Sequence, residues 1–269
     1  LLGLLTKEIV ITLPIVLWLY DLYFIHLAEV GKKFDLSNRV KRLYVYLPFL
    51  FLVALPYILL RSYLTRALIS STAPPRGYYV NLLTQAKALI KYMQLLLIPA
   101  GLNVEHYVAE AYTLLNWQVM LSTLLILLVL GISIWLYFSR NILSRMVSFV
   151  ILWFFIVLIP TTIVPLEVIL QENRGYLAAV SFAVLSGTVL GKVSSLKSSG
   201  KWISVVLLIL ILGVYSVSTI QRNRLWKDDI SLWSDSVQKS PLLARPHHNL
   251  AVSYREKGDL SAAIVEYRK

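Results

Sequence analysis

Three short stretches of the chain combine cations and carboxylates in patterns that could bind a phosphate or move a proton. They are Thr6-Lys7-Glu8, the segment 101–106 that ends in Glu-His, and the segment 171–177 with the sequence Gln-Glu-Asn-Arg-Gly-Tyr-Leu. The first and third stretches adjoin long apolar runs, and the second follows a run in which apolar residues alternate with lysines and glutamines. Ionisable side chains beside membrane helices are expensive to bury and are usually paired or functional.

Lys7 and Arg174 are the candidates for binding an anion. A guanidinium can hold a phosphate through two parallel hydrogen bonds, whereas an ammonium acts as a compact point charge. We expect both to approach one cavity at the outer membrane surface, where Glu8 or Glu172 would separate them when the cavity is empty. Tyr176 could orient a sugar or phosphate hydroxyl. The alternative is that these side chains are interfacial anchors with snorkelling stems.

Glu105 and His106 are adjacent and could take part in proton transfer or in a metal site. With Glu8, Glu172 and Tyr176 they complete the set of candidate positioning residues. No second histidine or carboxylate has the spacing of a metal ligand, so we assign no metal or cofactor, although a divalent metal stays open. The chain has no cysteine, which excludes disulfides and thiolate chemistry.

The composition indicates a membrane protein. Hydrophobic residues make up 58% of the chain and charged residues 15%, with a mean hydropathy of +0.70. The net charge of +12 could suggest nucleic acid. However, the basic residues sit mostly in short loops between apolar runs, which is typical of membrane orientation, so no nucleic-acid partner is expected.

Six apolar runs approach the length of about 20 residues that a bilayer core requires. They are 9–24, 43–60, 117–138, 146–164, 176–190 and 202–220, of which 176–190 is the shortest. Three basic loops fall on one side of these runs, with Lys32, Lys33, Arg39, Lys41 and Arg42 in the first, Arg140 and Arg145 in the second, and Lys192, Lys197 and Lys201 in the third. The positive-inside rule makes that side cytoplasmic.

The N-terminus, the segment 61–116, the loop 165–174 and the C-terminal tail are therefore predicted on the non-cytoplasmic side of the inner membrane. Within 61–116, the run 84–99 carries Lys87 and Lys91 four residues apart. This spacing predicts an amphipathic helix lying in the outer interface. Arg61, Arg66 and Arg76 also fall on this side, against the rule, and need a local reason.

The C-terminal tail has the pattern of a tetratricopeptide repeat, whose period is about 34 residues. Ala251, Tyr254, Ala263 and Tyr267 fall on its small and aromatic packing positions, and Trp233 and Pro241 fit the register one period upstream. We divide the chain into a membrane body, 1–222, and the start of a repeat domain, 223–269. Because the chain begins with Leu1 and stops inside the second helix of a repeat, we interpret it as an internal piece of a longer protein.

Together these motifs resemble the bacterial relatives of the transmembrane and tetratricopeptide-repeat O-mannosyltransferases. The resemblance rests on Thr-Lys-Glu before an apolar helix, the sequence 99–106 after an interfacial helix, Glu-Asn-Arg-Gly-Tyr-Leu at 172–177, and 224–233 leading into the repeats. It implies an all-α, polytopic GT-C bundle of about six spans and one interfacial helix, followed by repeats.

The same resemblance implies transfer of a sugar from a polyprenyl-phosphate donor to a hydroxyl, as on a protein Ser or Thr, outside the cytoplasm. Lys7 and Arg174 would then stabilise the departing phosphate, and the repeats would bind a protein or peptide. The family's catalytic acid lies in a first external loop that this chain does not contain. Two alternatives stay open: a non-catalytic membrane scaffold with repeats, and a transporter or flippase whose helices are kinked by prolines such as Pro14 and Pro160.

Overall fold

The computed structural model describes residues 8–24, 48, 52, 55, 56, 59, 75–196 and 199–269. These residues are mostly helical. The helices are η1 (Glu8–Thr12), α2 (Leu13–Tyr23), α6 (Tyr78–Leu97), α7 (Trp117–Tyr137), α8 (Ile142–Ile163), η4 (Glu172–Gly175), α9 (Ala179–Leu196), α10 (Gly200–Leu225), α11 (Asp229–Lys239), α12 (Ala244–Glu256) and α13 (Leu260–Tyr267). Two short strands, β1 (Glu105–His106) and β2 (Leu170–Gln171), pair with each other.

Four of the helices in the described part of the chain, α7 to α10, are long and apolar enough to cross a membrane. They correspond to four of the six predicted runs. The run 9–24 forms a shorter apolar helix, Ile9–Tyr23, and most of the run 43–60 lies outside the described residues. The predicted span 176–190 is displaced toward the C-terminus in α9, because Tyr176 to Ala178 form a turn after η4.

The bundle buries a few polar side chains by pairing them with one another, as membrane helices require. The Tyr23 and Ser148 hydroxyls are 2.6 Å apart, and Ser133 donates to the Ser148 carbonyl at 3.0 Å. Tyr137 and Phe149 pack around Tyr23, with ring centroids 4.7 Å and 5.9 Å away. These contacts fix α2, α7 and α8 against one another.

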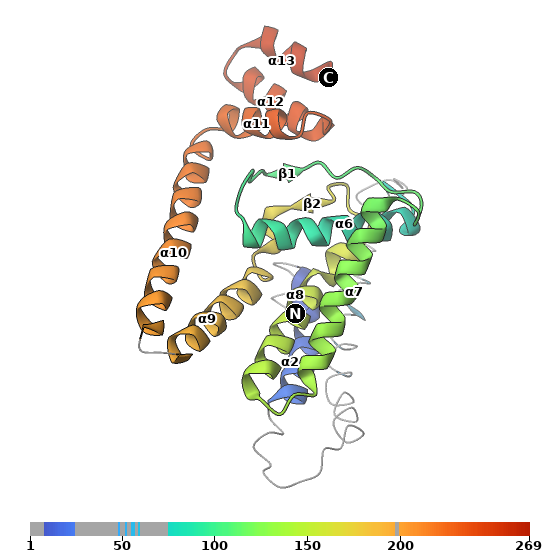
Figure 1. The fold of residues 1–269 in the computed structure, drawn as a ribbon. Coiled ribbons are helices and arrows are strands. Elements are labelled where there is room, and N and C mark those ends of the chain that lie inside the picture. The colour runs from blue at the N-terminus through green and yellow to red at the C-terminus, as the bar shows by residue number, and fades with distance from the viewer. Residues whose placement is uncertain are drawn as a thin grey trace.

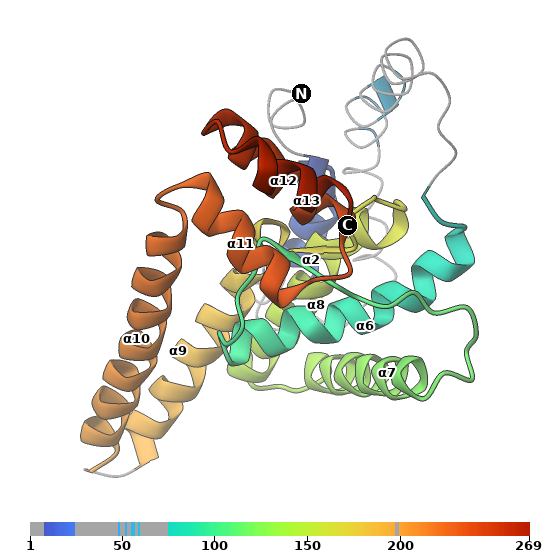
Figure 2. The same cartoon turned by 90° about the horizontal axis from the view of Figure 1, so that it is seen from above.

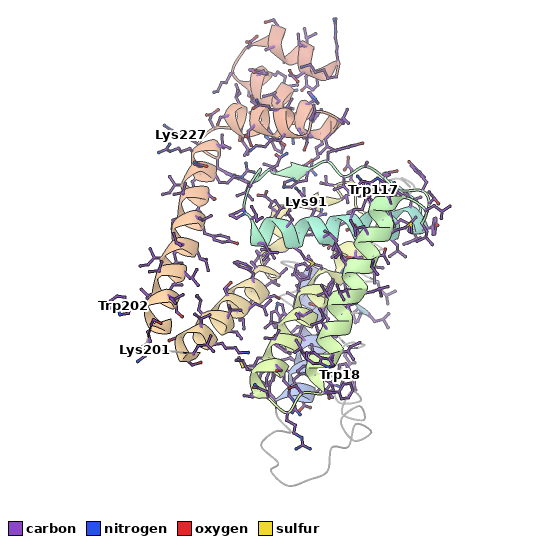
Figure 3. All side chains as sticks on the ribbon, in the orientation of Figure 1. Trp18, Lys91, Trp117, Lys201, Trp202 and Lys227 are labelled. Atoms are coloured by element: carbon purple, nitrogen blue, oxygen red, sulfur yellow. The ribbon has the colours of Figure 1, made fainter. Side chains whose placement is uncertain are left out.

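The basic loops between α7 and α8 and between α9 and α10 lie at the same end of the bundle (Figure 1). Lys201 and Trp202 mark this end of α10, and Lys227 lies just beyond its other end (Figure 3). The relative placement predicted for Arg140, Arg145, Lys192 and Lys201 is therefore observed, whereas the loop 25–42 and Lys197 lie outside the described residues. We call the opposite end, with α6, β1, β2 and η4, the cap.

Helix α6 lies at a steep angle to α7 and α8 at the cap end of the bundle (Figure 1), and seen from above it runs alongside α7 (Figure 2). It begins at Tyr78, six residues before the predicted 84, because extended Gly77 caps it and accepts the Asn81 N–H at 2.9 Å. Its buried face includes Asn81, Thr84 and Gln85, which is unlike the lipid-facing side of a span. This orientation agrees with the interfacial helix expected from the sequence; its position in a bilayer stays a prediction.

The contacts of Arg76 give a local reason for an arginine on the predicted outer side, where the positive-inside rule does not favour one. The side chain is only 9% exposed. It donates to the carbonyls of Leu166 (2.7 Å) and Glu167 (3.1 Å) and to the Glu110 carboxylate (3.0 Å). Arg76 therefore ties the segment before α6 to the loop after α8. Arg61 and Arg66 lie outside the described residues.

Helices α11 to α13 stand above the cap at the far end of α10 (Figure 1). Asp228 caps α11 by accepting the Ser231 N–H, and Gly258 turns the chain from α12 to α13 with φ of +86°. Ala251 and Ala263 are 0% and 2% exposed, so that small side chains let these two helices pack closely. The helical hairpin expected from the sequence is present, and its identity as a tetratricopeptide repeat stays a prediction.

The arrangement predicts that single cysteines at Ser195 and Gln238 react from opposite sides of the membrane. Ser195 lies near the end of α9, at the α9–α10 turn, and Gln238 lies in α11, and both are exposed. The neighbouring Ser236 is fully buried and would be a poor label site. An impermeant thiol reagent added outside intact cells should label the Gln238→Cys protein alone. Labelling of the Ser195→Cys protein alone would mean that the orientation in the membrane is the reverse of the predicted one.

Candidate functional site

The strands β1 and β2 bring together the second and third motifs of the sequence analysis. They pair antiparallel, with Glu105 opposite Gln171 and His106 opposite Leu170. Tyr92 of α6 holds β2 from below, because its hydroxyl donates to the Gln171 carbonyl at 2.8 Å and accepts the Gln171 N–H at 3.3 Å. Two loops more than 60 residues apart therefore form one layer on α6 (Figure 1).

The carboxylate of Glu172 is the centre of this layer. Its Oε1 accepts the backbone N–H of Asn103 at 2.5 Å and lies 2.9 Å from Nε2 of His106. Because a carboxylate only accepts, Nε2 carries the hydrogen in this pair. The guanidinium Nε of Arg222, from the last turn of α10, lies 4.0 Å from Oε2. His106 thus works with Glu172, and not with its sequence neighbour Glu105.

Glu105 instead faces the helices beyond α10. Its side chain is 1% exposed, and Oε1 lies 3.2 Å from Nη1 of Arg245 in α12 and 3.4 Å from the Gln171 amide. Its Oε2 is buried without a hydrogen-bond partner among the described residues. Burial raises the pKa of Glu105, and the Arg245 guanidinium opposes that rise only in part.

A second polar contact joins β1 to α11. The Asn103 amide donates to the Glu105 carbonyl (2.7 Å) and to the hydroxyl of Ser240 at the end of α11 (3.0 Å). Ser240 also accepts the Tyr107 N–H at 3.1 Å and donates to the Glu105 carbonyl at 3.0 Å. Lys239 donates to the Leu102 carbonyl at 2.8 Å. The helices after α10 are therefore docked on the cap.

Arg222 completes the joint, and the sequence analysis assigned it no role. It pairs with Asp235 of α11 at 3.2 Å, and Asp235 pairs in turn with Lys239 at 2.7 Å. Its guanidinium carbon also lies 5.9 Å from the centre of the Trp226 ring. The sequence did offer a signal, because an arginine follows the apolar run 202–220 almost directly. The run was predicted to end at residue 220, so Arg222 was placed after the helix, whereas α10 continues to Leu225.

Arg174 and Tyr176 lie beside this layer, in η4 and the turn after it. Arg174 is half-buried and donates from Nη1 to the Val168 carbonyl at 2.7 Å, whereas Tyr176 is 49% exposed. Between them, Gly175 approaches the Tyr92 ring so closely that an added Cβ would lie 3.3 Å from it. The structure therefore gathers Glu172, Arg174 and His106 in one cap.

The remaining candidates are Lys7 and Glu8. Lys7 lies outside the described residues, and so does the side chain of Glu8, although its backbone begins η1. The expected pairing of Lys7 with Arg174 around one anion therefore stays a prediction.

An apolar groove of about 100 Å³ lies next to the cap, between α6, α7, α8 and α9. Its walls include Met93, Leu96, Phe154, Phe155, Ser181 and Phe182. The first turns of α9 form one side, so the groove begins within a few residues of η4 along the chain. The Ser181 hydroxyl in its wall is buried without a hydrogen-bond partner among the described residues.

Among the described residues, no group of three His, Asp or Glu side chains could hold a metal ion. Comparison with known protein families, with curated proteins and with solved structures finds no match to this chain. The site is therefore interpreted from its own geometry and from the sequence motifs.

The raised pKa of Glu105 predicts an unusual pH dependence of stability. A carboxyl group whose folded-state pKa lies above its ordinary value near 4.5 binds its proton more tightly in the folded state. Its contribution to stability therefore falls as the pH rises above about 4.5. As the pH rises from about 4 to about 7, the stability of the Glu105→Gln variant should increase relative to that of the parent. The measurement is the difference between their thermal unfolding midpoints in detergent.

Glu110 provides a control of opposite sign. Hydrogen bonds from Tyr112 and Arg76 lower the pKa of Glu110, so its contribution is present above about pH 4.5 and is lost as the pH falls through the folded-state value. Glu110→Gln should therefore lose stability relative to the parent as the pH rises from about 3 to about 5, and the difference should then stay constant. The same trend in both variants would contradict the two environments described above.

Proposed function

We propose that this chain is part of a membrane glycosyltransferase that takes a sugar from a polyprenyl-phosphate donor and transfers it to a hydroxyl, as on a protein Ser or Thr. One observation carries the proposal: the cap holds Glu172, His106 and Arg174, and the wall of an apolar groove begins within a few residues of the end of η4, at Ser181. A lipid-linked sugar phosphate has the matching division into a charged head and a hydrocarbon tail. The sequence motifs at 99–106 and 172–177 support the same assignment.

The proposed reaction is a substitution at the anomeric carbon of the sugar. The acceptor oxygen forms a bond to that carbon while the bond from the carbon to the phosphate oxygen breaks. The acceptor proton passes to a general base, and the lipid phosphate leaves with one additional negative charge. Arg174, and Lys7 with it, would stabilise that charge, because preorganised cations act most strongly where charge develops.

We assign no general base among the described residues. Glu172 suits a different role, since its carboxylate is engaged by the Asn103 N–H and His106. Held there, it would set the position of η4, and with it Arg174 and Tyr176, which follow in the chain. His106 would orient Glu172, and Glu105 would support the strand from the other side.

We further propose that α11 to α13 begin a tetratricopeptide-repeat domain on the same, non-cytoplasmic side of the inner membrane. Ala251 and Ala263 pack at the hairpin as small residues of such a repeat would. Stacked repeats form an extended surface that suits a protein or peptide acceptor. A non-catalytic membrane scaffold is the second candidate, favoured by the use of Glu105 and Glu172 in docking contacts.

Substitution of Arg174 tests the proposed function in the full-length protein. In reconstituted vesicles supplied with a polyprenyl-phosphate sugar, Arg174→Lys should lower turnover at least about tenfold, which is about 1.4 kcal/mol of transition-state stabilisation. The reason is that lysine keeps the charge but loses the planar, two-pronged hydrogen bonding. Arg174→Ala should lower turnover further.

The matched control is Arg224→Lys, because Arg224 is an exposed arginine in the last turn of α10, at the cap end of that helix. This variant should retain the turnover of the parent. Full turnover by Arg174→Ala would remove Arg174 from the donor site. Absence of turnover by the parent with every polyprenyl-phosphate sugar tried would favour the scaffold.

A further inference from the structure

We infer that Ser240 and Arg245, both beyond the membrane body, are positioning residues that hold Glu172 and the cap in their working geometry. Their importance for catalysis rests on the proposed function, whereas the mechanical coupling does not. The inference follows from three chains of contacts that begin at α11 or α12 and end at Glu172 or at the strand beside it.

The shortest chain passes through Asn103. Ser240 accepts the Asn103 amide at 3.0 Å, and the backbone N–H of the same Asn103 donates to Glu172 at 2.5 Å. Ser240 also accepts the Tyr107 N–H and donates to the Glu105 carbonyl, so it contacts the strand on both sides of His106. A shift of α11 would therefore move Asn103 and His106, which both hold Glu172.

The second chain uses the alternation of side chains along a strand. Neighbouring residues of a strand point to opposite faces, and here Glu105 reaches Arg245 while His106 reaches Glu172. Arg245 therefore contacts one face of β1 through Glu105, while His106 on the other face orients Glu172. The third chain is the weakest and runs from Asp235 through Arg222, whose Nε lies 4.0 Å from Oε2 of Glu172.

Burial makes the contacts of Asn103, Glu105 and Ser240 hard to replace by water, whereas the Arg245 side chain that reaches Glu105 is itself 48% exposed. Asn103 is 0% exposed, Glu105 1% and Ser240 2%. A buried polar group that loses its partner bears the full cost of desolvation. The residues linked by these contacts should therefore move together and not replace their hydrogen bonds by bonds to water. Binding of an acceptor segment to the repeat helices could thus alter the donor site through the cap.

Hydrogen exchange measured by mass spectrometry on the full-length protein in nanodiscs tests this coupling. Arg245→Ala and Ser240→Ala should each accelerate amide exchange in 168–176 at least about fivefold, because that segment loses its support. The helices α7 and α8 should keep the protection of the parent. Arg245→Lys, which preserves the charge beside Glu105, should restore most of the protection.

The control is Lys257→Ala, since Lys257 and its partner Asp228 are 62% and 46% exposed, so water can replace that contact. This variant should exchange like the parent. Faster exchange confined to 102–107 and α11–α12, with 168–176 unchanged, would overturn the inference, because the helices would then be attached without positioning Glu172. Equal acceleration throughout α7 and α8 would overturn it as well, since the effect would be general destabilisation. Neither readout depends on sugar transfer.

Discussion

The structure of the cap depends on one physical constraint: polar and charged groups placed where little water reaches must be satisfied by each other. Asn103 and Glu105 are fully buried and Glu172 is partly buried, and each gains partners from distant parts of the chain. The strand pair, the turn into α9 and the docking of α11 and α12 all follow from these pairings. Glu105 meets the requirement only in part, because one of its carboxylate oxygens is buried without a hydrogen-bond partner among the described residues.

This constraint explains why the site and the helical hairpin region meet. The spans themselves need only length and apolar surface, which leaves their cap ends without defined geometry. The cap supplies it by combining α6, the β1–β2 pair, and the last turn of α10 (Figure 1). A lipid-linked donor would require this combination, because its head must be fixed by charges while its tail stays among apolar side chains.

The sequence predicts what depends on local pattern. Apolar length located α7 to α10, the spacing of Lys87 and Lys91 marked α6 as different from a span, and Ala251 and Ala263 marked the hairpin. It could not predict that His106 pairs with Glu172 and not with Glu105, because that choice depends on a register between loops 66 residues apart. Arg222, Ser240 and Arg245 were missed for the same reason, since their roles exist only once α11 and α12 are docked.

The central claim is that α11 to α13 are docked on the cap in one geometry. A pair of spin labels at Gln94→Cys in α6 and Arg255→Cys in α12 tests it, because both positions are exposed and the chain has no other cysteine. Pulsed electron paramagnetic resonance on the protein in nanodiscs should give a single narrow distance distribution. A broad distribution, unchanged when Ser240 is also replaced by alanine, would mean that the helices move independently and would contradict the account.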